Sequence, residues 1–226
     1  MVRATPRFFK MDAAIIQKIS IWALPVLFAI TVHEVAHGWV ALKFGDRTAQ
    51  MLGRLTLNPL KHIDPIGTIL VPIILLSLGG FVFGWAKPVP VTVTNLRNPK
   101  ADMAWVAMAG PAANIIMAIA WLLIMKLVAD VIGFGAWFAE PLYLMGMAGV
   151  VINIVLAIFN LLPMPPLDGG RVLASILPGK LSWQLSRLEP YSFIILVLLL
   201  ASGLLAKIIG PPINNALTYL FKLIGV

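Results

Sequence analysis

The sequence predicts an all-α protein that crosses a membrane several times. Hydrophobic residues make up 60% of the 226 residues, and the mean hydropathy is +0.96. Charged residues make up only 12%, whereas soluble domains average about a quarter. Several apolar runs are also long enough to cross a hydrocarbon core of about 30 Å. Together these observations exclude an ordinary soluble domain.

The chain is basic, with a net charge of +8 and 17 Lys and Arg residues. These residues are scattered, without the basic stripe or aromatic ladder of a nucleic-acid-binding protein. We interpret them as loop charges that orient the chain and meet anionic lipid headgroups, and we expect no nucleic-acid partner. The absence of cysteine excludes disulfides, thiolate metal ligands and cysteine nucleophiles.

The first predicted helix covers residues 19–44. Basic residues precede an apolar run over 19–30, as in a signal peptide, but no clear small-x-small cleavage site follows. The polar TVHEVAH at 31–37 continues the run without a break. We therefore expect an uncleaved membrane helix, preceded by a peripheral segment over 1–18 and followed by a polar loop over 44–65.

A short membrane-associated segment, either β or re-entrant, is predicted around residues 66–93. Residues 66–80 are apolar but carry Pro72, and at about 1.5 Å per residue they barely reach across the core as a helix. They form either a short span or a re-entrant segment. Residues 81–93 carry alternating prolines beside β-branched residues, which favours an extended edge strand.

Three further spans are predicted over residues 103–128, 142–162 and 191–209. Between the last two, MPPLDGGRVL breaks one helix with proline and glycine and starts another. The C-terminal segment 210–226 is expected to form a peripheral interfacial helix or half-span. The sequence holds no repeat and no soluble module, so we expect a single domain over 1–226 with its core over 20–190.

Two histidines and a glutamate lie together near the end of the first predicted helix. His33 and His37 are four residues apart, which places both imidazoles on one helix face as two ligands of one Zn²⁺. Glu34 lies between them and can act as general base toward a metal-bound water. HExxH fixes only three positions and also occurs by chance. Ionisable groups in an apolar helix are functional by default, however, which favours a metal site.

A catalytic zinc needs a third protein ligand and an open position. The candidates from residue type alone are His62, Asp46, Asp64, Asp102 and Asp168. Asp168 stands out because two prolines break the preceding helix, while Gly169 and the next glycine allow the backbone to approach a ligand closely. The alternative role for Asp168 is to cap the next helix in a surface turn.

These motifs, in this order, resemble the site-2 protease family of intramembrane zinc metalloproteases. HEVAH lies on an apolar helix, AGPAAN opens a later span, and NLLPMPPLDGG ends another. The NPLKHIDPIGT and FGWAKPVPV stretches resemble the small bacterial members without PDZ or CBS domains. The resemblance covers residues 20–190 and implies a core of three transmembrane helices with additional helices around it.

The resemblance implies one Zn²⁺ per chain, held by His33, His37 and Asp168, with Glu34 as catalytic base. An amide in an apolar helix, such as Asn160, either joins two helices or donates to an oxyanion. The resemblance implies that Asn160 positions the peptide or stabilises the oxyanion. It also implies supporting positions near the site, which are Gly110, Pro111, Asn114 and Gly169. His62 does not match the metal set of the family.

The implied activity is hydrolysis of peptide bonds in or near transmembrane segments of membrane-protein substrates, as in regulated intramembrane proteolysis. A transmembrane helix hides its peptide bonds, so the substrate must unwind locally. An extended edge could accept the unwound segment by strand addition. The candidate substrate-binding residues on this edge are Trp85, Lys87, Val89 and Val91. The alternative is a loop that lies on the membrane surface.

The resemblance places HExxH at the cytosolic side of a bacterial cytoplasmic membrane. The loops on that side, 43–65, 84–102 and 166–190, then hold ten Lys and Arg residues, and the other side holds seven. This distribution agrees weakly with the positive-inside rule. The agreement also requires 66–80 to enter and leave the membrane on one side.

Two other functions stay open on the sequence. One is a membrane ion or metal transporter in which His33, His37 and Asp168 line an ion path. The absence of an inverted repeat and the presence of only one carboxylate–histidine cluster argue against it. The other is a catalytically inactive relative, against which the presence of all four core residues argues.

Overall fold

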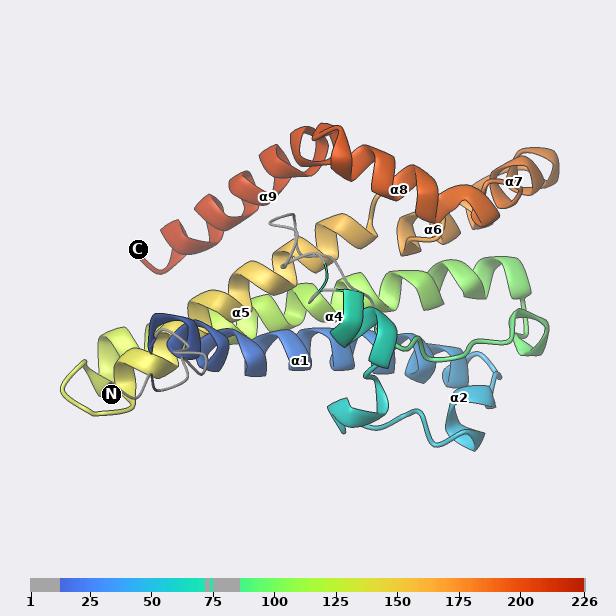
Figure 1. Ribbon diagram of the computed structural model, residues 1–226. Coiled ribbons are helices and arrows are strands. Elements are labelled where there is room, and N and C mark those ends of the chain that lie inside the picture. The colour runs from blue at the N-terminus through green and yellow to red at the C-terminus, as the bar shows by residue number, and fades with distance from the viewer. Residues whose placement is uncertain (1–12, 72–73, 75–85, 226) are drawn as a thin grey trace, which may run out of the picture.

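Figure 1 presents the computed structural model, in which residues 13–71, 74 and 86–225 are described. Every regular element in this part of the chain is helical. The long helices are α1 (Ala13–Lys43), α4 (Pro99–Leu127), α5 (Ala139–Asn160) and α9 (Leu204–Leu223). The shorter ones are α2 (Thr48–Met51), η1 (Pro59–Lys61), η2 (Pro65–Leu70), η3 (Val93–Asn95), η4 (Val128–Ile132), α6 (Asp168–Ile176), α7 (Gly179–Ser186), η5 (Glu189–Tyr191) and α8 (Ser192–Ala201).

Helices α1, α4 and α5 form an antiparallel bundle in which each helix packs against the other two (Figure 1). The predicted all-α membrane class is confirmed. Among the described residues, four helical stretches are long and apolar enough to cross a membrane: Ile16–Lys43, Pro99–Ile132, Ala139–Asn160 and Gly179–Ala201. Their outward faces keep large apolar side chains exposed, which suits contact with lipid chains.

Small residues bring α4 and α5 close together. A Cβ added to Gly146 would lie 2.5 Å from Met125 Cγ, and one added to Gly149 would overlap the Trp121 ring. Without a hydrophobic force between helices in lipid, such close contact supplies the packing energy. Beyond this contact, Met125, Val150 and their buried neighbours pack against side chains of α9.

The predicted last span over 191–209 is wrong in its boundaries. Gly203, which has φ +70°, separates α8 from α9, and the fourth candidate span instead runs from α7 through α8. The predicted C-terminal helix over 210–226 belongs to the longer α9. Hydropathy did not locate this break because the residues on both sides of Gly203 are equally apolar.

The predicted edge strand is also wrong within the described part of 81–93. Residues 86–92 have no regular structure, and η3 follows them. Proline removes the backbone donor at positions 88 and 90. Several of the remaining donors bind other elements, since Lys87 N–H donates to the His62 carbonyl and Thr92 N–H to the Asp46 carboxylate. The segment has no partner strand among the described residues and is held by side chains and loop carbonyls.

The ends of the bundle helices differ from the predicted ones by a few residues. Helix α1 already includes residues 13–18, which we expected in a peripheral segment, and α4 starts at Pro99, where proline suits the first helical turn. In the predicted 66–80 segment, η2 and Val71 are described, and most of the remainder lies outside the described residues. The choice between a span and a re-entrant segment stays a prediction.

Candidate metal centre and active site

The HEVAH histidines lie inside the bundle. His33 and His37 are ten and six residues from the end of α1 at Lys43, which corresponds to depths of about 15 and 9 Å along the helix. Both side chains are buried, and their rings meet edge to face with centroids 4.6 Å apart. The predicted placement of both imidazoles on one helix face is confirmed.

Asp168 reaches the two histidines from the first turn of α6. Just before it, the chain turns sharply after α5, and Leu167 is the N-terminal flanking residue of α6. Gly169 and Gly170 lie so close to the turn that a Cβ on Gly169 would lie 2.5 Å from the Leu162 carbonyl oxygen. The predicted helix break at PPLDGG is confirmed, and the glycines serve the close approach of α6 to the end of α5.

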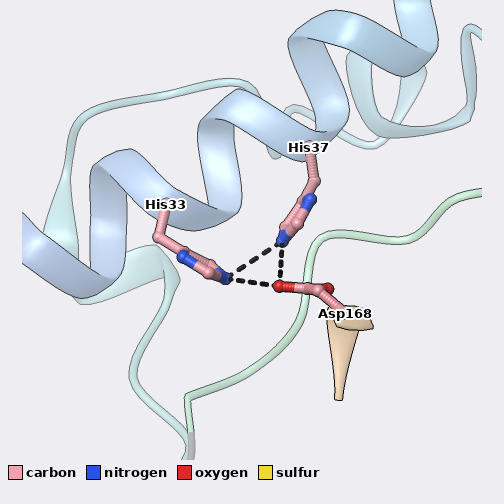
Figure 2. Close-up of side chains that lie close together, drawn as sticks. All are labelled: His33, His37 and Asp168. Carbon is pink, nitrogen blue, oxygen red and sulfur yellow. Dashed lines mark hydrogen bonds and ion pairs between the residues drawn. The ribbon is translucent and has the colours of Figure 1, made fainter. Parts of the chain in front are cut away.

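The three side chains converge on one point, as Figure 2 shows. His33 Nε2 lies 3.0 Å from His37 Nε2. Asp168 Oδ2 lies 3.2 Å from His33 Nε2 and 3.3 Å from His37 Nε2. Asp168 is 131 residues beyond His37 in the sequence, so only the fold brings this carboxylate to the helix pair.

The outer nitrogens of the imidazoles fix which atoms carry protons. His33 Nδ1 lies 2.6 Å from Asn114 Oδ1, and His37 Nδ1 lies 2.6 Å from the Val106 carbonyl oxygen. Both oxygens only accept, so each Nδ1 carries the proton and donates it. In neutral imidazoles the two Nε2 atoms then present lone pairs. Three electron-pair donors, the two Nε2 atoms and Asp168 Oδ2, thus face one another.

This arrangement fits a zinc ion. Asp168 Oδ2 is buried and receives no hydrogen bond from the described residues. A tetrahedral Zn²⁺ with ligand distances of about 2.0–2.1 Å requires ligand atoms about 3.3 Å apart, close to the observed 3.0–3.3 Å. The oriented Nδ1–H groups complete the outer hydrogen bonds typical of metal-binding histidines. The triad leaves a fourth coordination position for substrate or water.

Gly110 of α4 lies directly against the two imidazoles of the metal-binding triad. A Cβ at this position would lie 2.5 Å from His33 Cε1 and 2.6 Å from His33 Nε2, and it would also overlap His37 Nε2. Only glycine lets α4 pass this close to the imidazoles. The next residue, Pro111, has no N–H and therefore removes one backbone hydrogen bond of α4. The carbonyl that loses this bond is next to the Val106 carbonyl, which accepts from His37 Nδ1–H.

A cavity of about 850 Å³ opens over the triad and includes Glu34. Glu34 Oε2 accepts a 2.7 Å hydrogen bond from Val89 N–H, which belongs to the extended segment before η3. Asn160, at the end of α5, also lines the cavity, and one of its amide hydrogens goes to the Leu156 carbonyl. The cavity therefore combines a metal-binding triad with a separate carboxylate and a separate amide.

Comparisons with known proteins agree with this geometry. The sequence model of peptidase family M50 matches residues 21–139 and 130–202. The chain belongs to peptidase family M50. The predicted resemblance to the site-2 protease family is thereby confirmed.

The M50 match runs from α1 through α8. The chain is 38% identical over 201 residues to a Bacillus subtilis (strain 168) protein named "Putative zinc metalloprotease YwhC", covering 88% of this chain and 89% of that protein. It is 29% identical over 185 residues to "Putative zinc metalloprotease Rip2" of Mycolicibacterium smegmatis, covering 80% of this chain and 66% of that protein. No solved structure matches the chain significantly.

The other candidate ligands of this M50 peptidase lie away from the triad and have local roles. Asp46 binds the Thr92 N–H, and Asp64 accepts from the N–H groups at the start of η2. Asp102 reaches back to the Asn98 N–H at the start of α4, and His62 donates to the Thr56 carbonyl. Each of these groups satisfies loop or helix-end backbone, which is the commonest use of such residues outside a site.

Two of the four predicted substrate-binding residues line the cavity. Val89 and Val91 line it, and Val91 also packs against the cluster of Ala41, Leu96 and Val106. Lys87 is not among the lining residues, and its carbonyl accepts from Arg54 instead. Trp85 lies outside the described residues.

Sequence reasoning missed Asn153. This buried side chain accepts a 2.8 Å hydrogen bond from the Asn114 amide, whose other donated bond goes to the Ala29 carbonyl. Asn114 thus joins α1, α4 and α5 directly behind His33. The available signal was the spacing of Asn153 and Asn160, which are seven residues and hence about two helical turns apart on one face of α5.

Proposed function

We propose that this protein is an intramembrane zinc endopeptidase that cleaves membrane-protein substrates in or near their transmembrane segments. The observation that carries the proposal is the position of the triad and Glu34 in one cavity, at a depth of about two helical turns inside a candidate span. A soluble peptidase would have no reason to bury this chemistry among lipid-facing helices.

The protein is a metalloprotease of family M50, and zinc is its metal. His33, His37 and Asp168 would hold the ion through Nε2, Nε2 and Oδ2. Zinc in such a site supplies Lewis acidity that polarises a carbonyl and makes water acidic near neutral pH. Asn114 and the Val106 carbonyl orient the imidazoles, so that both lone pairs point to the same place.

Glu34 is the proposed general base. Val89 N–H holds Oε2, while Oε1 has no hydrogen-bond partner in the described residues. Oε1 is therefore free to take a proton from the attacking water and to pass it to the amine that leaves. The hydrogen bond to Oε2 fixes the direction of the carboxylate, because a carboxylate with one oxygen held cannot rotate freely.

Asn160 and the segment around Val89 are the proposed substrate contacts. The second amide hydrogen of Asn160 is available for the carbonyl oxygen of the scissile bond, where negative charge develops. The backbone beside Val89 and Val91 offers an extended surface along which an unwound substrate segment can lie. The edge pairing itself would form only when the substrate supplies the second strand.

We place the protein in a bacterial cytoplasmic membrane, with the cavity toward the cytosol. The end of α1, the start of α4 and the turn after α5 lie toward the same end of the bundle (Figure 1). The segments on this side, 43–65, 84–102 and 166–190, hold ten of the 17 Lys and Arg residues of the chain. Basic loops stay on the cytosolic side of a membrane, which supports this orientation.

The test is cleavage of a panel of single-span reporter proteins in liposomes, with zinc content measured for each enzyme variant. We expect Glu34→Gln to keep its zinc and to lose cleavage, because glutamine retains the shape but cannot take a proton. We expect His37→Ala to lose both zinc and cleavage. Glu189→Gln is the matched control, since Glu189 also lines the cavity and is exposed.

Each result separates the proposal from its competitors. Zinc in both the wild type and Glu34→Gln without cleavage of any reporter would favour a transporter or an inactive relative. Cleavage by Glu34→Gln at the wild-type rate would contradict the role of Glu34. Cleavage of a soluble unfolded peptide but not of any membrane reporter would contradict the intramembrane assignment.

A further inference from the structure

Helix α6 contributes more than Asp168 to the cavity. Asp168, Arg171 and Ser175 all line it. Their spacing of three and four residues places them on one helix face. Arg171 is therefore one turn along α6 from the metal-binding carboxylate, a separation of about 4.5 Å along the axis. An extended peptide advances about 3.3 Å per residue, so the guanidinium can reach side chains within a few residues of the scissile bond.

The guanidinium of Arg171 is free to bind a ligand. Arg171 is exposed, and its side chain forms no hydrogen bond or ion pair with the described residues. Lys100, the other cation among the described residues that line the cavity, is already engaged with the Leu177 carbonyl at the end of α6. The two cations therefore have different roles, and Lys100 joins α4 to α6 while Arg171 remains available.

The charges in the cavity favour an anionic ligand. Among the described lining residues, the two basic groups and a bound zinc ion would bring four positive charges, and Asp168, Glu34 and Glu189 bring three negative ones. Glu34 is held by Val89 N–H, and Glu189 forms no ion pair with Arg171. The guanidinium of Arg171 would repel a basic residue beside the scissile bond of the substrate. It would form an ion pair with an acidic residue there.

We propose that Arg171 is a specificity-determining residue that binds the carboxylate of an Asp or Glu side chain close to the scissile bond of the substrate. This inference rests on the proposed function. The planar guanidinium fork matches a carboxylate with two parallel hydrogen bonds, which lysine does not reproduce. The enzyme thus selects transmembrane substrates that carry an acidic residue where the unwound segment enters the cavity.

The test uses a single-span reporter in which one Asp is moved, position by position, across the six residues on each side of the cleavage site. Binding is measured with the zinc-loaded Glu34→Gln enzyme by fluorescence anisotropy, and cleavage is measured with the wild type. At the best position we expect Asp to bind about five- to tenfold more tightly than Asn, as one charge-assisted contact implies. The Arg171→Ala substitution should abolish this ratio, and Arg171→Glu should transfer the preference to a Lys-bearing reporter.

Two further variants test whether the effect is specific to the guanidinium of Arg171. Lys180→Ala removes a cation from the neighbouring helix α7 that does not line the cavity, and it should keep the Asp preference. Arg171→Lys should retain only part of it. An equal loss for Asp and Asn reporters in Arg171→Ala would indicate a structural role and overturn the proposal. An effect that appears only in vesicles with anionic lipid, regardless of the reporter, would indicate a lipid phosphate and overturn it as well.

Failure of this inference is distinguishable from failure of the proposed function. If the wild type cleaves the reporters with no charge preference at any position, Arg171 has no role in specificity, and the protease assignment stands. If the wild type cleaves none of them while Glu34→Gln still prefers the Asp reporter, the binding site stands and the peptidase assignment fails.

Discussion

Replacing Gly110 with alanine tests the metal centre without touching any ligand. The new Cβ would lie 2.6 Å from His33 Nε2, whereas ordinary contact begins at 3.4 Å. The imidazoles or α4 must therefore retreat by at least about 0.8 Å, which exceeds the roughly 0.2 Å tolerance of zinc–ligand distances. We expect zinc affinity to fall about 10- to 100-fold, as when the support of a metal ligand is removed, and cleavage to fall with it.

The assay is zinc binding by the purified variant in competition with a chelating indicator, together with reporter cleavage at saturating zinc. The control is Gly179→Ala at the start of α7, where the added Cβ meets no other part of the described structure within 4 Å. This control should change helix stability by no more than about 1 kcal/mol and keep wild-type zinc affinity. Wild-type zinc affinity and cleavage in Gly110→Ala, with a normal elution volume and circular dichroism spectrum, would refute the reasoning.

Three further perturbations follow from the same contacts. Asn114→Leu removes the acceptor of His33 Nδ1 and should weaken zinc binding about tenfold or more; unchanged binding in the same indicator assay would contradict it. Asp46→Asn should loosen the segment before η3 and raise KM more than it lowers kcat, because one carboxylate oxygen holds Thr92 N–H. Burial raises the pKa of Asp46, but hydrogen bonds from Thr48, Thr92 and Asn95 lower it by more. The stabilisation is therefore complete above the unfolded pKa of about 4 and is lost as pH falls below it. Melting temperatures of wild type and Asp46→Asn should differ at pH 7 and converge toward pH 3; a constant difference would exclude this role. Val91→Pro should slow cleavage if its N–H pairs with substrate, with zinc content unchanged, and an unaltered rate on the same reporter would end the pairing model.

Much of the fold followed from local sequence. The bundle helices α1, α4 and α5 were predicted to within a few residues, because long apolar runs leave helix as the only way to satisfy the backbone in lipid. The pairing of His33 with His37 also needed no tertiary information, since four residues make about one helical turn. The break between α5 and α6 at PPLDGG followed from proline and glycine chemistry.

Other features could not be read from local pattern. Prolines before η3 favour extended backbone, but a strand also needs a partner, and the described residues supply carboxylates and carbonyls instead. The break at Gly203 lies in a mostly apolar stretch, where hydropathy carries no information about helix direction. Asn153 resembled any amide in a membrane helix until its contact with Asn114 placed it behind the metal centre.

The sequence by itself determined the class of protein, the helix that carries HExxH and the family. On residue type it left five candidates for the third ligand, because ligation depends on a distance between side chains that are far apart in the chain. Only tertiary packing brings Asp168 Oδ2 to 3.2 Å from His33 Nε2, since α6 packs against α4. Gly110 permits the close approach of α4 to the imidazoles, and Gly169 that of α6 to the end of α5. Local spacing fixes neighbours on one helix, whereas convergence across 131 residues is decided by how the helices pack.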